Sequence, residues 1–345
     1  MNPHALFIIA SSLATGTVIT LLSHHWLLAW VGLEINTLAM IPLMTKTPHP
    51  RAIEAATKYF LTQAAASAMI LFSSTLNAWS TGEWSINNLT DPTSSTMLSI
   101  ALAMKLGLAP LHFWLPEVLQ GLTLINGLIL STWQKLAPMA LLIQLSQSLN
   151  LTLIMTLGIA STLIGGWGGI NQTQLRKVMA FSSIAHLGWM ISIMKFAPQL
   201  TMFNFLLYLI MTSTMFLTLM SLSAKKISEL STAWPKAPTL AAMSMLTLLS
   251  LSGLPPLSGF TPKWLIAQEL IKQNATPFAT VILLSTLLSL FFYLRLTYIM
   301  ALTLAPNPST STTFWRTKNE YTSSLLIVLS LAMIPITPTI LSVMP

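Results

Sequence analysis

Four ionisable residues lie deep inside long apolar segments, where a charge is expensive. Glu34 lies about ten residues from either end of its segment, or about 15 Å along a helix. Lys105, Lys135 and Lys263 have similar positions in their own segments. An ionised residue at the centre of a membrane helix costs about 2.5 to 3.5 kcal/mol. We therefore expect these residues to face the interior of a helix bundle and to serve a function there.

Carboxylate and ammonium groups placed in this way can relay protons. Desolvation weakens the hold of a buried lysine on its proton, and a nearby carboxylate strengthens it again. Movement of Glu34 relative to Lys105 would therefore switch the lysine between holding and releasing a proton. His186 is a candidate intermediate, because imidazole accepts and donates on different edges. The alternatives are static ion pairs between helices, or helix ends placed wrongly in the sequence, and, for His186, a hydrogen-bonded core histidine.

The composition requires a membrane setting for these residues. Of 345 residues, 54% are hydrophobic and 7% are charged, against roughly 25% charged in soluble domains. Long apolar runs predict an all-α membrane protein with about eleven spanning helices in a single polytopic domain, 1–345. The spans are expected at 3–22, 25–44, 58–79, 96–115, 121–145, 150–170, 177–195, 200–222, 238–272, 277–303 and 323–343.

Two proline-rich motifs predict discontinuous helices. The first runs from Lys105 to Pro116 and the second from Ser252 to Trp264. Proline lacks an amide hydrogen and leaves carbonyl groups that need partners other than lipid. Such breaks usually line a hydrated cavity. His112 lies within the first break, and it fits equally a residue that contacts the cavity and one that caps freed carbonyls.

The charges outside the spans predict the orientation. The net charge of +8 is scattered singly rather than gathered in a patch, so nucleic acid is excluded as a partner. Short loops on the non-translocated side accumulate Lys and Arg. This predicts an N-terminus on the matrix or cytoplasmic side and a C-terminus on the opposite side. Loops on the N-terminal side hold Lys46, Arg51, Lys58, Arg176, Lys177, Lys225, Lys226, Lys236, Arg316 and Lys318, and the other side holds Lys195 and Lys272.

Other features favour structural roles. The chain has no cysteine, which excludes disulfides and cysteine-ligated iron–sulfur clusters. The glycines of Gly165–Gly169 are expected to allow close helix packing. His24, His25 and Trp26 are interpreted as an anchor at the membrane interface, and Arg295 is expected to reach the membrane surface.

Several motifs together resemble one family. They are Trp30–Asn36, His49–Ala55, Lys58–Gln63, the two broken-helix motifs and Arg176–His186. Over essentially the whole chain, the sequence resembles the subunit 2 family of mitochondrial NADH:ubiquinone oxidoreductase, respiratory complex I. The resemblance implies an antiporter-like bundle of the membrane arm. It also implies that Glu34 is the family's membrane glutamate, Lys105 the lysine of the first broken helix, Lys135 the central lysine and Lys263 the terminal gate residue.

The resemblance also implies the setting of the protein. It implies a multi-pass subunit of the mitochondrial inner membrane, with its N-terminus on the matrix side and its C-terminus on the intermembrane-space side. Its partners would be other membrane-arm and accessory subunits and lipids such as cardiolipin. The chain itself would carry no cofactor, because NADH, FMN, iron–sulfur clusters and ubiquinone belong to the wider complex. Two further readings remain open: an independent transporter that exchanges a cation or solute for protons, and a structural spacer of the membrane arm.

Overall fold

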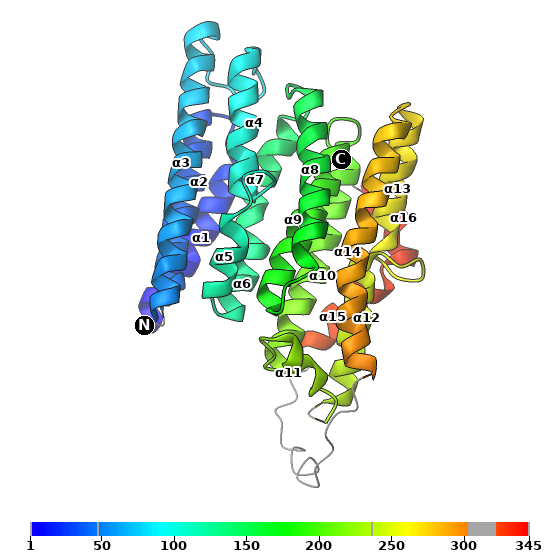
Figure 1. Cartoon of the computed structure of the whole chain (residues 1–345). Coiled ribbons are helices and arrows are strands. Elements are labelled where there is room, and N and C mark those ends of the chain that lie inside the picture. The colour runs from blue at the N-terminus through cyan, green and yellow to red at the C-terminus, as the bar shows by residue number, and fades with distance from the viewer. Residues whose placement is uncertain (1, 47, 236, 303–321, 344–345) are drawn as a thin grey trace. The chain divides into compact units, whose positions relative to one another are not determined.

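The chain folds into helices throughout the part that the structure describes. A computed structural model describes residues 2–46, 48–235, 237–302 and 322–343. The regular elements in these ranges are helical, apart from two isolated bridges between loops (Figure 1). The all-α prediction is therefore confirmed. Packing divides the chain into two compact units, Met1–Ser161 and Thr162–Pro345, and the single domain expected over 1–345 stays a prediction.

Helices in the first unit pack mainly against their sequence neighbours, α1 on α2, α2 on α3, and α3 on both α4 and α5. The last helix, α8, continues into the second unit. The elements are α1 (Pro3–Leu22), α2 (Trp26–Met44), α3 (Pro50–Thr81), α4 (Pro92–Leu106), α5 (Trp114–Gly121), α6 (Leu124–Ser131), α7 (Trp133–Gln144) and α8 (Leu151–Gly169).

In the second unit, α10 is central and contacts α9, α12, α13 and α15, while α14 packs along α12. The remaining elements are α9 (Leu175–Ile193), α10 (Pro198–Ser221), α11 (Ile227–Ser231), α12 (Pro238–Ser252), α13 (Phe260–Lys272), α14 (Thr276–Leu302), α15 (Thr322–Ala332), the short helix η2 (Ile334–Ile336) and α16 (Thr337–Val343).

Each of the eleven expected spans coincides with a helix or with a broken pair of helices. Six helices of the described chain are long and apolar enough to cross a membrane, namely α1, α2, α3, α8, α10 and α14, and the pair bent by 66° at the C-terminus makes a seventh. The other four expected spans fall on α4, on α6 with α7, on α9, and on α12 with α13.

Both predicted breaks are present, and both begin at a glycine. The first helix half ends at Leu106 and the second at Ser252. Gly107 and Gly253 follow with φ of +78° and +82°, in the left-handed region. Each glycine donates its amide hydrogen back into the last turn, which ends a helix cleanly without the steric cost that a side chain would add. The chain then resumes helical structure at Trp114 and at Phe260.

Three predicted boundaries were wrong. The span expected at 121–145 is interrupted at Thr132, between α6 and α7. The span at 323–343 bends at the segment that contains Pro335, which cannot donate a backbone hydrogen bond to the helix. The helix expected to begin at residue 58 begins at Pro50, and Lys58 is therefore helical rather than in a loop.

The early start of α3 joins it to the broken helix α5. Lys58 Nζ lies 2.5 Å from Glu54 Oε1 on its own helix and 2.6 Å from Glu117 Oε2 on α5. Gly121, the last residue of α5, approaches so closely that an added Cβ would lie 2.6 Å from the Arg51 carbonyl oxygen. The ion pairs are partly exposed and add little stability in water, but with the glycine contact they place α5 directly on α3.

The glycines of α8 pack closely against two other helices, and Trp26 is fully buried. An added Cβ at Gly165 would lie 2.7 Å from the Ala185 backbone nitrogen of α9, and one at Gly166 would lie 2.7 Å from Leu288 Cβ of α14. The expected close packing of α8 through its glycines is thus confirmed. Trp26, by contrast, is 0% exposed rather than an interfacial anchor. Burial in the unit outweighs the interfacial preference of its indole ring.

One end of the second unit is organised by a short pairing between two loops. Leu175 donates to the Lys225 carbonyl oxygen at 3.1 Å, and Ile227 donates to that of Thr173 at 3.2 Å. Glu229 caps α11, because its carboxylate accepts from the backbone amides of Lys225 at 2.5 Å and Lys226 at 3.4 Å. The Lys225 amide bond is the main cause that lowers the pKa of Glu229 below its ordinary value of 4.5.

Glu229→Gln is expected to loosen this pairing by about 0.5–1 kcal/mol, the usual contribution of a helix cap. A carboxyl with a lowered pKa stabilises the folded state above its ordinary pKa, and this contribution is lost as pH falls through the lowered pKa. Hydrogen exchange at the Lys225 and Lys226 amides should therefore be faster in the variant at pH 7. As pH falls through the lowered pKa of Glu229, the two proteins should become alike. Equal protection at pH 7 would contradict the capping role.

Candidate functional site

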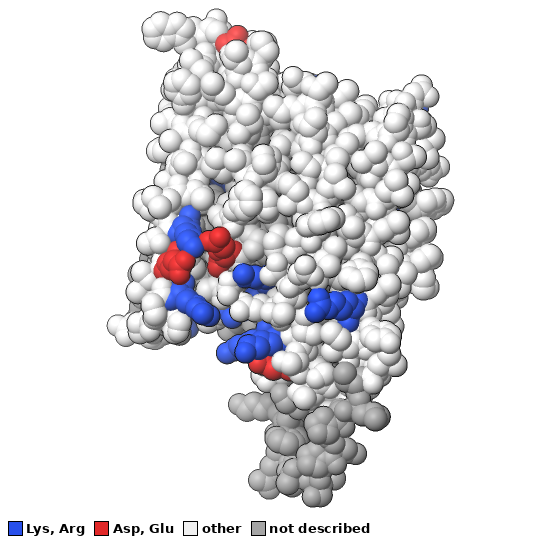
Figure 2. All heavy atoms as spheres, in the orientation of Figure 1, with Lys and Arg blue, Asp and Glu red and all other residues white. Residues whose placement is uncertain are grey.

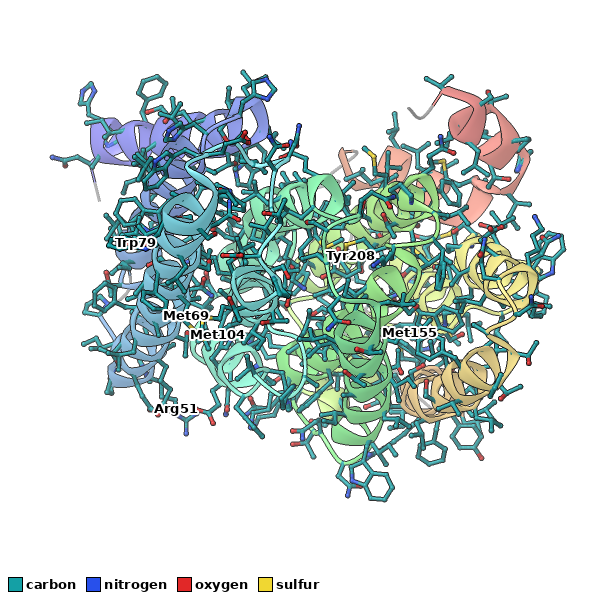
Figure 3. The ribbon with its side chains drawn as sticks, turned by 90° about the horizontal axis from the view of Figure 1, so that it is seen from above. Arg51, Met69, Trp79, Met104, Met155 and Tyr208 are labelled. Carbon is teal, nitrogen blue, oxygen red and sulfur yellow. The ribbon has the colours of Figure 1, made fainter. Side chains whose placement is uncertain are left out.

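Lys105 lies in the last turn of α4, immediately before the first break. Its side chain is buried, with the residue 6% exposed, and its Nζ atom has no hydrogen-bond partner within the protein. The C-terminal end of a helix carries partial negative charge, which favours an ammonium group there. The break is fixed beside it, because Trp114 Nε1 donates to the Met104 carbonyl oxygen at 3.1 Å. Figure 3 labels Met104 among the helices of this unit.

Glu34 supplies the negative charge of this region. It lies in the middle of α2, and its Oε2 atom is buried without a hydrogen-bond partner. The carboxylate acts electrostatically on Lys105 and on Tyr59, yet it forms no ion pair with Lys105 within 4.0 Å. Buried polar atoms are nearly always hydrogen-bonded to protein or to ordered water. The two groups therefore suit a connection through water rather than a direct contact.

Lys135 lies in the first turn of α7, just after the unpredicted break at Thr132. The residue is 3% exposed. At this break, the Thr132 hydroxyl and amide both bond to the Leu128 carbonyl oxygen, at 2.7 and 3.0 Å. The N-terminal end of a helix carries partial positive charge, which opposes an ammonium group. Lys105 and Lys135 thus occupy helix ends of opposite polarity.

One cavity joins the two lysines. Its volume of about 20 Å³ is sufficient for a water molecule. Glu34 is not among the lining residues, but its neighbours Leu33, Asn36 and Thr37 are. In all, five polar residues that the sequence did not single out line the cavity, namely Asn36, Thr37, Tyr59, Gln63 and Gln134.

Lys263 in the second unit spans the second break. It lies in the first turn of α13, and its Nζ atom donates to the carbonyl oxygen of Ser252, the last residue of α12, at 2.7 Å. The ammonium group therefore caps the C-terminal end of α12. Gly253 leaves room for this approach, because an added Cβ there would lie 2.8 Å from Lys263 Nζ, and its φ of +82° also disfavours a side chain. The lysine is thus tied to the helix break itself.

A second cavity brings Lys263 together with His186. Its volume is about 10 Å³, near the minimum for one water molecule. His186 is 6% exposed, and its ring centroid lies 5.9 Å from that of Tyr208, which Figure 3 labels. Trp189, Tyr293 and the hydroxyl residues Thr162, Ser285, Thr286 and Ser289 also line this cavity.

The structure thus groups the predicted residues by unit. Lys105 and Lys135 line one cavity with Glu34 nearby, and His186 and Lys263 line the other. His112 lines neither; its Nδ1 atom lies 3.3 Å from the Pro110 carbonyl oxygen, which fits the capping interpretation. Arg295 donates to the Ile170 carbonyl oxygen at 2.6 Å, just past the end of α8. Lys236, Arg316 and Lys318 lie outside the described residues.

The chemistry available at these cavities is proton exchange. Lysine, carboxylate and imidazole can bind and release protons, and the amide and hydroxyl groups around them can orient water. Within the described ranges, no three His, Asp or Glu side chains gather as a metal site would require. The arrangement therefore suits the movement of protons between buried groups.

Two family models cover most of the chain. The model described as NADH:quinone oxidoreductase/Mrp antiporter, TM, matches residues 23–289. NADH dehydrogenase subunit 2 C-terminus matches residues 290–341. NADH-ubiquinone oxidoreductase chain 2 of Aquarana catesbeiana is 64% identical over 343 residues, which cover 99% of each chain. The same protein of Xenopus laevis is 64% identical over 345 residues, 99% of this chain and all of its relative. The chain belongs to the NADH-ubiquinone oxidoreductase chain 2 family.

Solved structures confirm the antiporter-like fold of this family member. A chain of respiratory complex I from Thermus thermophilus superimposes with a TM-score of 0.86 at 27% identity, covering 98% of this chain and 79% of its own. A chain of the Mrp complex from Dietzia gives 0.83 at 18% identity, covering 96% and 75%. The protein is a multi-pass, antiporter-like subunit of mitochondrial complex I, a proton-translocating NADH:ubiquinone oxidoreductase.

Proposed function

We propose that the chain moves protons through five residues, Glu34, Lys105, Lys135, His186 and Lys263. Lys105, Lys135 and His186 are buried, and Glu34 and Lys263 are half-buried. The observation that carries the proposal is the first cavity, where Lys105 and Lys135 meet beside the charge of Glu34. Two buried lysines around one small space repel each other when both are charged. A single proton shared between them, with Glu34 as the compensating charge, is the arrangement of lower electrostatic energy.

In this proposal, helix polarity biases where the proton rests. The end of α4 favours an ammonium at Lys105, and the start of α7 opposes one at Lys135. A shift of Glu34 away from Lys105 would remove the advantage of Lys105 and let the proton pass through water to Lys135. In the second unit, release of Lys263 from the Ser252 carbonyl would free a lysine to exchange a proton with His186 through the second cavity.

The redox chemistry is assigned to other subunits in this proposal. The chain has no cysteine to hold an iron–sulfur cluster. NADH, FMN, the clusters and ubiquinone then belong to the wider complex, and no cofactor binds this chain. Electron transfer elsewhere would reach these residues as a movement of charge or of helices. The broken helices are suited to respond, since their free ends lie beside Lys105 and Lys263.

The proposed placement puts the N-terminus on the matrix side and the C-terminus on the intermembrane-space side. The excess of Lys and Arg in loops on one side supports this orientation. The partners would be neighbouring membrane-arm and accessory subunits and inner-membrane lipids such as cardiolipin, with no nucleic acid. Exposed apolar residues on several helices, such as Phe7, Phe72 and Leu284, provide the surface for lipid and for other membrane subunits.

Glu34→Gln in assembled complex I tests the proposal. The amide keeps the shape of the side chain and removes its charge, so Lys105 loses its compensating carboxylate. We expect assembly near the wild-type level and a fall of at least about fivefold in NADH-driven proton uptake by proteoliposomes, because one charge interaction of about 1 kcal/mol already changes an equilibrium about fivefold. Proton uptake is measured with an entrapped pH-sensitive dye alongside NADH oxidation.

Glu54→Gln is the matched control. It makes the same chemical change in the same unit, but the Glu54 side chain is 60% exposed and pairs with Lys58 at the surface. We expect uptake within twofold of wild type, about what a surface pair allows. Glu34 is not part of the relay if the Glu34→Gln and Glu54→Gln enzymes have the same proton uptake per NADH and the same rate of uptake. The structural-spacer reading then gains support.

A further inference from the structure

Five cationic residues gather at one end of the second unit, and they are called the basic cluster here. The pairing of 173–175 with 225–227 brings the start of α9 beside the loop that follows α10. A small apolar pocket lined by Leu175, Leu230 and Leu296 joins these two loops to α14. The basic cluster consists of Arg176, Lys177, Lys225, Lys226 and Arg295.

The charge of the basic cluster exceeds what the nearby acidic residue can offset. Glu229 is the carboxylate on the elements that form the cluster, and it accepts bonds from backbone amides of Lys225 and Lys226. Lys177, Lys225 and Lys226 form no ion pair within 4.0 Å among the described residues. In Figure 2, Lys and Arg side chains lie over the region where Figure 1 places α11. The cluster is thus suited to an anion.

Exposed aromatic and aliphatic residues lie next to the basic cluster. Trp167 is 74% exposed on the last turn of α8, three residues before the carbonyl that Arg295 contacts. Tyr298 is 66% exposed, one turn beyond Arg295 on α14. Trp and Tyr concentrate at the level of lipid headgroups. On the other side of Arg295, toward the start of α14, an exposed apolar stripe is formed by Leu284, Leu287, Phe291 and Leu294.

The basic cluster and the apolar stripe of α14 together favour one class of ligand. A soluble phosphate or nucleotide would satisfy the cations but would leave the adjoining apolar stripe of α14 unused. An acidic protein segment would likewise need an apolar face at membrane depth. A phospholipid with an anionic headgroup meets both, because its phosphate groups reach the cations while its acyl chains lie along Leu287 and Phe291. A headgroup with two phosphates would balance the charge of five cations better than a headgroup with one phosphate.

We propose that the basic cluster binds the headgroup of an anionic phospholipid carrying two phosphates, with its acyl chains against α14. Arg295 has a special position in this site. Its guanidinium bonds to the end of α8 while its own helix carries the apolar stripe, so it lies where headgroup and acyl chains meet. The site rests on the proposed membrane placement of the chain, and it is independent of the proton relay.

The test uses intact complex I that carries Lys177→Gln, Lys225→Gln and Lys226→Gln together. The enzyme is delipidated and placed in phosphatidylcholine nanodiscs with a photoactivatable cardiolipin. In the wild type, cross-links should map to α14 and to the end of α8. The triple variant should lose them by at least about tenfold, because each basic residue near an anionic headgroup contributes about fivefold in binding. The matched control is Lys195→Gln with Lys272→Gln. Lys195 follows the end of α9 that is remote from the basic cluster, and Lys272 is the last residue of α13. This variant should keep the cross-links.

Three outcomes would overturn the site. Undiminished cross-linking in the triple variant would show that the cluster does not hold the lipid. Competition by inorganic phosphate as effective as competition by unlabelled cardiolipin would indicate a soluble-anion site. Chemical cross-links from Lys225 or Lys226 to a neighbouring subunit, without lipid cross-links in the wild type, would assign the cluster to a protein partner. Proton uptake at saturating lipid should be unchanged in the triple variant, so failure of the lipid site and failure of the relay are separately visible.

Discussion

Lys135→Met is expected to lower coupled NADH:ubiquinone turnover of complex I by at least about tenfold, a conservative figure for the loss of one proton-transferring group. Methionine retains an unbranched apolar stem in a residue that is 3% exposed, so packing around the cavity should survive. The ammonium that would receive a proton from Lys105 is gone. The rate of NADH oxidation and the proton uptake per NADH oxidised are both measured in proteoliposomes, and the amount of assembled complex is determined in parallel.

Lys272→Met provides the comparison for this result. Its side chain is 62% exposed at the last turn of α13, where it pairs with Glu269 at 3.4 Å. The substitution removes the same charge from a residue outside both cavities and should leave turnover unchanged. Normal assembly with a normal ratio of protons to electrons in Lys135→Met would exclude Lys135 from the relay. Loss of assembly in Lys135→Met alone would instead assign the lysine a structural role.

The sequence predicted most of the fold because long apolar runs leave few choices. A backbone in lipid must satisfy its own hydrogen bonds, so each run becomes a helix. The two proline-rich breaks were also predictable, since proline and a left-handed glycine both act locally. The interruption at Thr132 has no comparable local signal. Its only nearby proline is Pro138, six residues later, and the break depends on tertiary packing that periodicity does not report.

The site was predictable only in part, for a related reason. Charged residues in apolar runs stand out, which identified Glu34, Lys105, Lys135 and Lys263. Neutral polar residues do not stand out, and Asn36, Gln63 and Gln134 became recognisable only where their side chains line the first cavity. Tyr59 and Gln63 are four residues apart on α3 and share a helix face, a weak signal that would have suggested a polar stripe. The bond from Lys263 to Ser252 required coordinates, because eleven residues separate the two.

Helix ends explain why lysines can be buried here at all. Lys105 ends α4, Lys263 caps the end of α12, and both therefore meet partial negative charge from carbonyl groups. Lys135 lies at the start of α7, at a helix end of the opposite polarity. The breaks thus create helix ends, with their partial charges, inside the membrane-spanning segments. Lys105 and Lys263 lie at ends with partial negative charge, and Lys135 lies at an end with partial positive charge.

Gly259→Ala is expected to prevent most of the assembly of complex I. Gly259 immediately precedes α13, and an added Cβ would overlap the carbonyl oxygen of Ser250 on α12 far inside van der Waals contact. The φ of −68° is ordinary for any residue, so the obstacle is space rather than backbone conformation. Because the obstructing atom belongs to the backbone, no side-chain rotation relieves the overlap. The two halves of the broken helix must separate, at a cost above the about 1–3 kcal/mol typical of overpacked cores.

The amount of assembled enzyme, measured by native electrophoresis with an in-gel NADH activity stain, checks this expectation. Gly82→Ala is the control, because an added Cβ there meets nothing within 4 Å. Its φ of +76° costs a side chain about 1–2 kcal/mol in the left-handed region, which an exposed helix end should tolerate. Similar assembly of the two variants would show that α12 and α13 can move apart freely. In that case the bond from Lys263 to Ser252 could not hold the second break in one geometry, and the relay would lose its fixed point in the second unit.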